Sequence, residues 1–351
     1  MCLVSQNIKP LVSNKDIVTF KVLEKSCAKN GYVTPFRETA VSLNEVMKAN
    51  NDVIELTDDY LHNVIEGGAI HSCIAVSHIV EILEAGRIIV KCIIKAGTPF
   101  YVGFNFTDIA STELFITDEI ISEVNDCEEI LKETRQELYN LVREETAKEY
   151  KDNVVKIGDI LLSDRKTFVS PDNLNSNMMP IGIVSFFYAD GKPHITALNQ
   201  KRCTWGNCSK PVNVVGARKE AYDNFDGYNN TKRFVEKHKN DLKQFESFMY
   251  CNDYKTEGTE SGDWFFPSTG EVLHTCRYLY MVNVAIAKIR ELFPNMDVQD
   301  FIYGTNYWDS AEISQTNAWY CRTNNAYVYY YTNKWNSGYV RPSLALDVAQ
   351  A

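Results

Sequence analysis

Ten cysteines and six histidines are the side chains that could bind a metal or act as nucleophiles in this chain of 351 residues. No two cysteines form a C-x-x-C pair, and the closest two, Cys203 and Cys208, have no second pair of ligands beside them. A structural zinc site needs four ligands, so no metal site is predicted. His71 and His78 would share one helix face, but two turns separate them, which is too far for shared ligation. The cysteines are therefore expected to be free, buried thiols of a reducing compartment, and no cofactor is expected.

Motifs of common catalytic sites are also missing from the sequence. No Ser-His-Asp order, nucleophile elbow or glycine-rich phosphate loop occurs along the chain. We therefore expect a protein that binds other molecules and has no enzymatic activity.

Residues 307–346 are rich in groups that recognise other molecules. Within 324–339, tyrosine and tryptophan alternate with short polar residues, and only Ala326 and Val328 are apolar and non-aromatic. Aromatic rings supply large rigid contact area, and the short polar side chains supply adaptable hydrogen bonds. The three tyrosines at 329–331 cannot all face inward on a strand whose side chains alternate. The segment predicts a ligand-binding surface; an aromatic contact between subunits is the alternative interpretation.

Charge and hydropathy argue against two kinds of partner. The net charge of −10 disfavours a polyanion, so nucleic acid is not an expected partner. No apolar stretch approaches the length that spans a bilayer, so membrane insertion is not expected. The first ten residues, MCLVSQNIKP, lack a charged segment followed by an apolar one, which predicts synthesis in a cytosol without a secretory signal peptide.

The length of the chain predicts two or three domains. Strand-like segments at 17–23 and 88–94 surround an expected helix over 72–85, so residues 1–115 are assigned to a small mixed α/β domain. Residues 116–151 follow as a connecting helix, because apolar or small side chains recur at alternating steps of four and three: Ile120, Val124, Cys127, Leu131, Thr134, Leu138 and Leu141. This spacing is typical of a short coiled coil, trimeric in one arrangement, and equally of a single helix packed on its own domain.

Residues 152–351 form the remaining predicted domain. Strands are expected over 155–162, 180–187 and 194–198, helices over 221–250 and 270–293, and strands again from Phe301 onward. Together the segments predict an α+β fold.

Motifs of this C-terminal part occur in a characteristic order. They are Gly158-Asp159-Ile160, Pro180-Ile181-Gly182-Ile183-Val184, Thr204-Trp205-Gly206, Gly262-Asp263-Trp264-Phe265-Phe266-Pro267-Ser268, Tyr307-Trp308-Asp309-Ser310-Ala311-Glu312, Asn317-Ala318-Trp319-Tyr320 and Tyr339-Val340-Arg341-Pro342. In this order they resemble the C-type-lectin-like domain of the variable proteins of diversity-generating retroelements, which include phage major tropism determinants and have fixed relatives among Bacteroides surface proteins. The resemblance covers residues 154–346. A looser one relates His71-Ser72-Cys73 and Gly97-Thr98 to an N-terminal domain of Bacteroides and phage proteins.

The resemblance implies a C-type-lectin-like fold with a frame and a displayed surface. The frame would consist of the buried rings of Tyr307, Trp308 and Trp319, with Ser268 capping a helix and Arg341 as a buried ion-pair partner or carbonyl donor. Between them the family displays, and in many members diversifies, its contact residues. Carried onto this chain, the ligand-binding residues would be Asp309, Ile313, Gln315, Arg322, Asn324, Tyr327, Tyr329, Tyr330, Tyr331, Asn333, Trp335, Asn336, Ser337 and Tyr339.

A non-enzymatic receptor-binding protein is the function that the resemblance implies. Its ligand would be a host-cell surface protein or glycan, and its place a phage or prophage tail or fibre, with the N-terminal domain joined to other virion proteins. A homo-oligomer, such as a trimer, would raise the avidity. A cytoplasmic location, a bacterial surface adhesin and a formylglycine-generating-type enzyme using Cys276 and Cys321 are the alternatives. A calcium-dependent lectin is disfavoured because the Glu-Pro-Asn ligand motif is absent.

Overall fold

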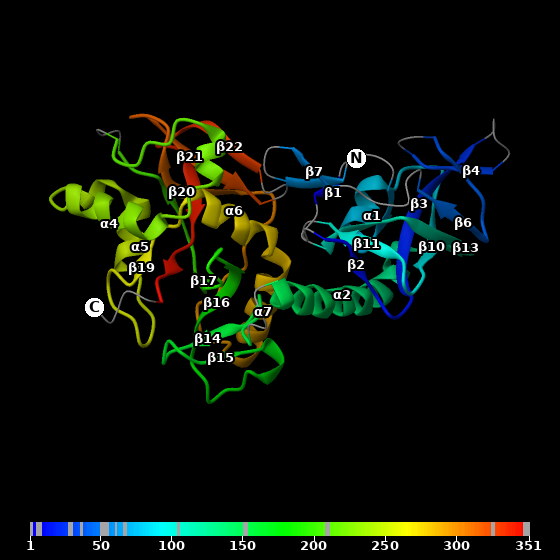
Figure 1. The fold of residues 1–351 in the computed structure, drawn as a ribbon, viewed down its shortest axis with the longest axis horizontal. Coiled ribbons are helices and arrows are strands. Elements are labelled where there is room, and N and C mark those ends of the chain that lie inside the picture. The colour runs from blue at the N-terminus through cyan, green and yellow to red at the C-terminus, as the bar shows by residue number, and fades with distance from the viewer. Residues whose placement is uncertain are drawn as a thin grey trace. The chain divides into compact units, whose positions relative to one another are not determined.

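Figure 1 shows the chain as a computed structural model. It describes residues 3–4, 9–26, 31–35, 38–49, 56–59, 62–65, 69–103, 106–149, 154–207, 211–323 and 327–346. These residues form sheets with mainly antiparallel pairing and several helices, which confirms the predicted α+β class. The chain divides into two compact units, Met1–Thr146 and Ala147–Ala351. We describe each unit by itself.

The N-terminal unit is built on a large antiparallel sheet with strand order β2-β11-β12-β9-β3-β10-β13-β6, with β4 and β5 joined to β3. Phe20, Leu23 and Val90 on its two central strands are fully buried, because β-branched and aromatic side chains cover both faces there. The elements are β1 (Leu3–Val4), β2 (Leu11–Val12), β3 (Ile17–Ser26), β4 (Gly31–Val33), β5 (Ala40–Val41), β6 (Glu45–Lys48), β7 (Leu56–Asp59), β8 (His62–Ile65), β9 (Ile70–Cys73), α1 (Val76–Ile82), β10 (Arg87–Ile94), β11 (Pro99–Val102), β12 (Asp108–Ser111), β13 (Glu113–Ile121), the 3-10 turn η2 (Val124–Cys127) and α2 (Glu128–Glu149).

Both helix predictions in this unit placed the helix start too early. Residues 70–73 form β9, which pairs residue by residue with β12, so α1 begins only at Val76. Similarly, β13 pairs with β10 on one side and β6 on the other, and α2 begins at Glu128. In each case the partners that hold the strand are distant in sequence, and local periodicity does not reveal them.

The side chains of the predicted coiled-coil seam pack against the sheet of the N-terminal unit itself. Thr134, in the middle of the seam, donates a hydrogen bond from Oγ1 to the carbonyl oxygen of Val18 on β3, at 2.9 Å. Cys127 and Leu131 before it are fully buried, and Ile120 is not helical but lies on β13. The coiled-coil interpretation of this seam is therefore wrong, and the alternative of one amphipathic helix packed on its own domain is the arrangement observed.

The C-terminal unit contains two sheets. The first has the order β15-β14-β16-β17-β24-β19, and the second, which we call the tyrosine sheet, has the order β18-β23-β20-β21-β22. The elements are β14 (Ile160–Leu162), β15 (Phe168–Val169), η3 (Pro171–Asn173), β16 (Pro180–Phe187), β17 (Pro193–Ala197), β18 (Lys201–Thr204), α3 (Arg218–Tyr222), α4 (Gly227–Lys237), η4 (Leu242–Gln244), α5 (Glu246–Asp253), β19 (Trp264–Phe265), α6 (Thr269–Arg277), α7 (Leu279–Leu292), β20 (Asn306–Glu312), β21 (Asn317–Arg322), β22 (Tyr327–Asn333), β23 (Ser337–Val340) and β24 (Ser343–Leu344).

Neither of the two long helices predicted here is continuous. The segment 221–250 contains α4, η4 and the start of α5, and the segment 270–293 is broken at Tyr278 between α6 and α7. The predicted start of α6 is confirmed: Glu271, three residues after Ser268, accepts the Ser268 backbone N–H at 2.6 Å, as in a capping box.

Helices cover both faces of the middle of the tyrosine sheet. On one face, Trp308, Ala318 and Val340 share a core with aromatic residues of α4 and α5. On the other face, α6 packs against β20 and β21 (Figure 1). Side chains in the centre of this sheet are therefore buried on both faces. Exposed side chains occur at the ends of the sheet and on its outer strands.

Position 338 on β23 has room only for glycine, because the indole ring of Trp308 packs closely against it. A Cβ atom at this position would lie 2.6 Å from Nε1 and 2.7 Å from Cδ1 of Trp308, which is itself buried. We expect Gly338→Ala to lower the free energy of unfolding by about 1–3 kcal/mol, because the core must shift to admit the methyl group. Urea denaturation followed by tryptophan fluorescence measures this loss. Gly216→Ala is the control, since a Cβ there would meet nothing within 4 Å, and equal stability of both variants would contradict the prediction.

Candidate binding surface

Six of the predicted ligand-binding residues lie together at one end of the tyrosine sheet, where β20 turns into β21 and β22 turns into β23. We call them the turn surface: Ile313, Gln315, Asn333, Trp335, Asn336 and Ser337. The two turns are joined by a hydrogen bond of 2.9 Å from the Lys334 N–H to the carbonyl oxygen of Thr316. All six are exposed except Ile313, which is half-buried.

Trp335 is the largest exposed side chain of the turn surface, with 56% of its area accessible. The backbone that carries it is held in place: the side-chain oxygen of Asn333 accepts the Trp335 N–H at 3.0 Å, and the Asn333 carbonyl accepts the Asn336 N–H at 2.9 Å. Such a turn presents the indole from a fixed backbone, so little conformational entropy is lost when a partner covers it.

A buried ion pair lies beneath these turns. The Lys334 ammonium is 2.9 Å from Oε1 of Glu312, and both side chains are 0% exposed. The other carboxylate oxygen of Glu312 accepts the backbone N–H of Val212 at 2.6 Å, and the Lys334 Nζ lies 4.4 Å from the centre of the Trp205 ring. The carboxylate thus fixes the loop at 211–215 against the base of the turn surface. The sequence did not reveal this pair, because a lysine in a polar turn is ordinarily exposed.

A second aromatic group lies on β21 and β22. The rings of Tyr320 and Tyr329 stack with their centres 5.3 Å apart and planes 9° apart, and Trp308 meets Tyr320 edge-on at 5.9 Å. Tyr329, a predicted ligand-binding residue, is thereby half-buried. Asn324 and the side chains of Tyr327, Tyr330 and Tyr331, also predicted to bind the ligand, lie outside the described residues.

Two other predicted residues lie apart from the turn surface. Tyr307 and Trp308 are neighbours on β20, so their side chains point to opposite faces of the sheet. The Tyr339 ring lies 5.7 Å from the Tyr307 ring, whereas Tyr329 stacks on Tyr320, which contacts Trp308. Tyr339 and Tyr329 are therefore on opposite faces. Arg322 is exposed at the far end of β21, where it pairs with Asn306. The fourteen-residue set therefore does not form one continuous patch among the described residues, and the turn surface is its compact part.

Asp309 was predicted as a contact residue, and the structure contradicts this. Its side chain is 0% exposed, and Oδ1 accepts the Ala311 N–H at 2.9 Å. The pairing of β20 with β21 shifts register between Trp308 and Glu312, and α6 covers this face of the strand, so Asp309 is enclosed. Burial raises the pKa of its carboxyl to about 8.

The frame residues expected around the surface are where the resemblance implied. Tyr307, Trp308 and Trp319 are buried, and the Trp319 indole N–H donates to the Val215 carbonyl at 3.0 Å. Arg341 is a buried carbonyl donor, with hydrogen bonds to the backbone oxygens of Ala197 and Gln299.

The two thiols named for the enzyme alternative lie in the core of the C-terminal unit. Cys276 and Cys321 are neighbours, but both are fully buried, and burial together with the adjacent Cys276 thiol raises the pKa of Cys321 well above its usual value. A cysteine nucleophile needs the opposite shift. The described thiols are all free and buried, as predicted: Cys73, Cys92, Cys127, Cys203, Cys251, Cys276 and Cys321.

A serine and a histidine also meet inside this unit. The Ser185 Oγ lies 2.7 Å from Nδ1 of His194 and 3.1 Å from the Thr275 hydroxyl, and the three side chains are buried. Burial lowers the pKa of His194 to about 3, so the imidazole is neutral. The pair links β16, β17 and α6 inside the core, and the other ring nitrogen of His194, Nε2, has no hydrogen-bond partner among the described residues.

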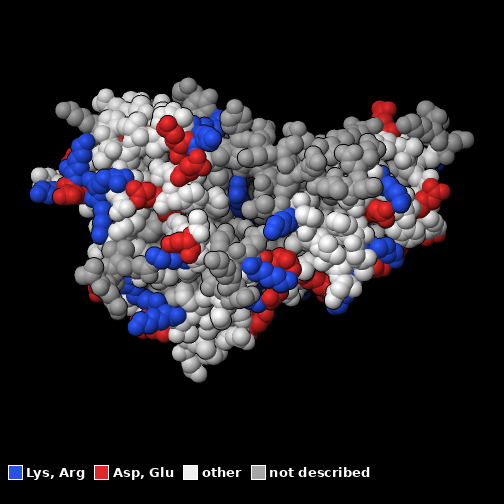
Figure 2. Space-filling view, in the orientation of Figure 1, with Lys and Arg blue, Asp and Glu red and all other residues white. Residues whose placement is uncertain are grey.

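Metal binding and membrane insertion have no visible site in the part of the chain that the structure describes. It contains no group of three or more His, Cys, Asp or Glu side chains that could hold a metal ion, and no helix there combines the length and hydropathy needed to cross a bilayer. On the face shown in Figure 2, acidic and basic side chains both occur among the described residues, and several basic ones gather at the left of the view.

No family model and no curated protein matches the chain. Among solved structures it is similar to a fimbrial protein from Bacteroides ovatus, with 16% sequence identity and a TM-score of 0.44. The match covers 54% of this chain and 49% of that chain, so it spans about half the length of the structure it matches. A likeness at this level identifies neither the fold family nor the function.

Proposed function

We propose that the chain is a non-enzymatic binding protein whose C-terminal unit recognises a protein or glycan on a host-cell surface through the turn surface. The observation that carries this proposal is the exposed indole of Trp335 on a hydrogen-bonded turn above a fully buried ion pair. An exposed tryptophan contributes little to folding, whereas tryptophan is the residue most enriched at binding hot spots. Exposed asparagine, glutamine and serine around it supply a polar rim.

The biological setting in this proposal comes from the resemblance to retroelement variable proteins. We place the protein in a phage or prophage particle, with the N-terminal unit joined to other virion proteins and several copies acting together. Because the seam of α2 is occupied by its own unit, self-association would use another surface. The ordered motifs from Gly158 to Pro342 support this setting, and an adjacent reverse-transcriptase gene with a near-copy of the 307–342 coding segment would establish diversification.

Replacement of Trp335 by alanine tests the surface directly. We expect Trp335→Ala to weaken binding of the labelled full chain to intact Bacteroides cells by at least about 30-fold, equivalent to about 2 kcal/mol at a hot spot. The free energy of unfolding should stay within about 0.5 kcal/mol of the original value, since the side chain is exposed. Flow cytometry over a concentration series measures the first quantity, and urea denaturation the second.

Tyr303→Ala is the matched control for this experiment. Tyr303 is 55% exposed and precedes β20, so it lies at the opposite end of the tyrosine sheet from Trp335. Its replacement should leave binding unchanged. Equal binding by the Trp335 variant would refute the turn surface as the contact site. Treating the cells with protease or with periodate shows whether the receptor is a protein or a glycan.

A further inference from the structure

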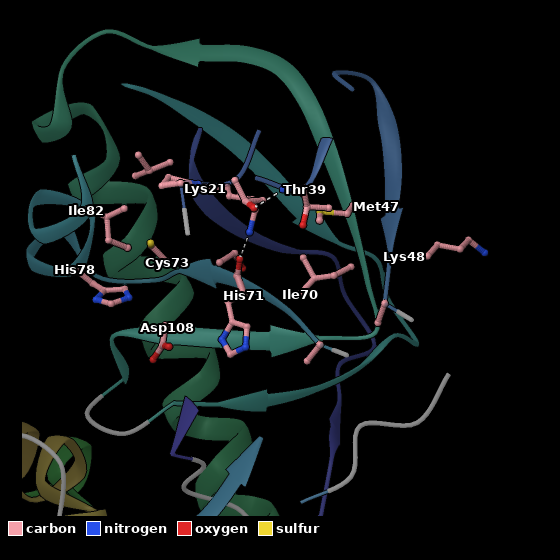
Figure 3. Close-up of a pocket in the computed structure, with 16 residues that line it drawn as sticks. Lys21, Thr39, Met47, Lys48, Ile70, His71, Cys73, His78, Ile82 and Asp108 are labelled. Atoms are coloured by element: carbon pink, nitrogen blue, oxygen red, sulfur yellow. Dashed lines mark hydrogen bonds between the residues drawn. The ribbon is translucent and has the colours of Figure 1, made fainter. Parts of the chain in front are cut away.

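The N-terminal unit contains a cavity of about 180 Å³ beside β3 and β9 (Figure 3). Aliphatic side chains, among them Met47, Ile70 and Ile82, supply much of its wall. An apolar cavity of about 150 Å³ holds a benzene molecule, so this one, whose wall is partly polar, has room for a ligand of similar or slightly larger size. The proposed function of the C-terminal unit makes no use of it.

Lys21 brings an amine into this cavity. It lies on β3 in the middle of the sheet, is 9% exposed, and Figure 3 shows its Nζ directed to the carbonyl oxygen of His71, at 2.5 Å. Within the described part of the chain no carboxylate pairs with this amine, and the ionisable groups that act on it are the thiols of Cys92 and Cys73. An ammonium group has three donors, so one neutral acceptor leaves both its charge and its hydrogen-bonding capacity unsatisfied.

Ser72 adds a second unsatisfied group to the same wall. Its side chain is only 3% exposed, and its hydroxyl oxygen has no hydrogen-bond partner among the described residues. Buried hydroxyls are normally hydrogen-bonded, so a missing partner on a cavity wall indicates a group that a bound molecule completes. Ser72 and Lys21 both line this cavity.

Asp108 is an acidic side chain of the same cavity wall. The carboxyl group is enclosed, it accepts a hydrogen bond of 3.1 Å from the Thr107 hydroxyl, and burial raises its pKa while the neighbouring His78 acts in the other direction.

We propose that this cavity binds a small monocarboxylate with an apolar body. The ligand carboxylate would pair with the Lys21 ammonium and accept a hydrogen bond from the Ser72 hydroxyl, and its hydrocarbon part would lie against Met47, Ile70 and Ile82. A carboxylate supplies the counter-charge that the buried lysine lacks, and its two oxygens match the two donors.

Binding in this site is linked to protonation of Lys21. Burial lowers the pKa of the Lys21 amine in the free protein, and a bound carboxylate would raise it again. The complex therefore takes up a proton at pH values between the free and bound pKa, and affinity decreases as the pH rises through that range.

Isothermal titration of the full chain with sodium hexanoate tests the proposal. We expect saturable binding of hexanoate, and no comparable binding of 1-hexanol or hexylamine, which have the same hydrocarbon body with a neutral or a positive head. Lys21→Met, which keeps the length and apolar stem of the side chain, should weaken hexanoate binding at least tenfold. Lys95→Met is the matched control, because Lys95 lies in the same unit and is exposed, with its ammonium 2.8 Å from Asp16.

If Lys21→Met does not fold, three other variants still test the proposal. Ser72→Ala should weaken hexanoate binding, and Ile82→Trp should abolish it by filling the cavity. Lys48→Met tests whether Lys48 binds the carboxylate in place of Lys21. Lys48 also lines the cavity, but its side chain is 70% accessible and pairs with Glu113. Loss of binding in Lys48→Met with retention in Ser72→Ala and Ile82→Trp would overturn the proposal, as would equal affinity for 1-hexanol or the absence of saturable hexanoate binding.

Discussion

Lys334→Met is expected to lower the free energy of unfolding of the C-terminal unit by about 3–5 kcal/mol, because it leaves a buried carboxylate without its counter-ion. Glu312 and Lys334 are both fully buried, and the loop at 211–215 reaches the same carboxylate through the N–H groups of Val212 and Asn213. Methionine has a similar length and can occupy the space beside the Trp205 ring, so the loss would report the charge rather than a cavity. Urea denaturation of the full chain, followed by tryptophan fluorescence, measures the change.

The double variant Lys334→Met/Glu312→Gln separates the charge from the loop contacts. A glutamine oxygen at 312 can still accept the Val212 N–H while carrying no charge, so the double variant should be more stable than Lys334→Met alone. Lys288→Met serves as control, since Lys288 is half-buried rather than fully buried, its partner Glu291 is exposed, and its loss should cost no more than about 1 kcal/mol. A loss in Lys334→Met no larger than in this control would show that the buried pair does not stabilise the fold.

Asp309→Asn is expected to remove a pH dependence from the stability of the same unit. With a folded pKa of about 8 against an ordinary value of 3.8, the Asp309 carboxyl keeps its proton in the folded chain and loses it in the unfolded chain between these two pH values. The folded state then binds more protons, so this residue makes the folded state less stable as the pH rises, by about 1.4 kcal/mol per pH unit across that window. Below the window the carboxyl is neutral in both states, and above it the residue contributes no further change.

The stability difference between the variant and the original chain isolates this one carboxyl. Asparagine keeps the oxygen that accepts the Ala311 N–H and has no charge to desolvate. We therefore expect similar stabilities near pH 4 and a growing advantage of Asp309→Asn up to about pH 8, measured by urea denaturation at a series of pH values. Parallel pH profiles for the two proteins would mean that Asp309 is ionised in the folded state.

Local sequence patterns were sufficient for the features that depend on neighbouring residues or on composition. The α+β class, the start of α6 with Ser268 and Glu271, and the free buried thiols were all predicted correctly. The buried rings of Tyr307, Trp308 and Trp319 and the carbonyl-donating Arg341 followed from the ordered motifs of the resemblance. Each of these features depends on a short pattern or on the strong preference of large rings for the core.

Sequence periodicity failed where strand pairing between distant segments determines the structure. It placed the start of two helices inside β9 and β13, because the hydrogen-bonding partners of those strands lie far away in the chain. It also could not separate a coiled coil from a helix packed on its own domain for the α2 seam, where Thr134 bonds to β3 of the same unit. A helical pattern records that one face is buried but not what buries it.

The sequence by itself predicted a binding surface within residues 307–346, since their composition suits neither a core strand nor a disordered tail. Only the tertiary structure decided which of those side chains can meet a partner. The register shift in β20 and the packing of α6 enclose Asp309, opposite sheet faces separate Tyr329 from Tyr339, and adjacent turns bring Trp335 together with Gln315. The placement of Lys334 against Glu312, and of Lys21 in a cavity, likewise depends on contacts across the fold. A residue's type limits what it can bind, whereas its exposure is set by neighbours that approach through space.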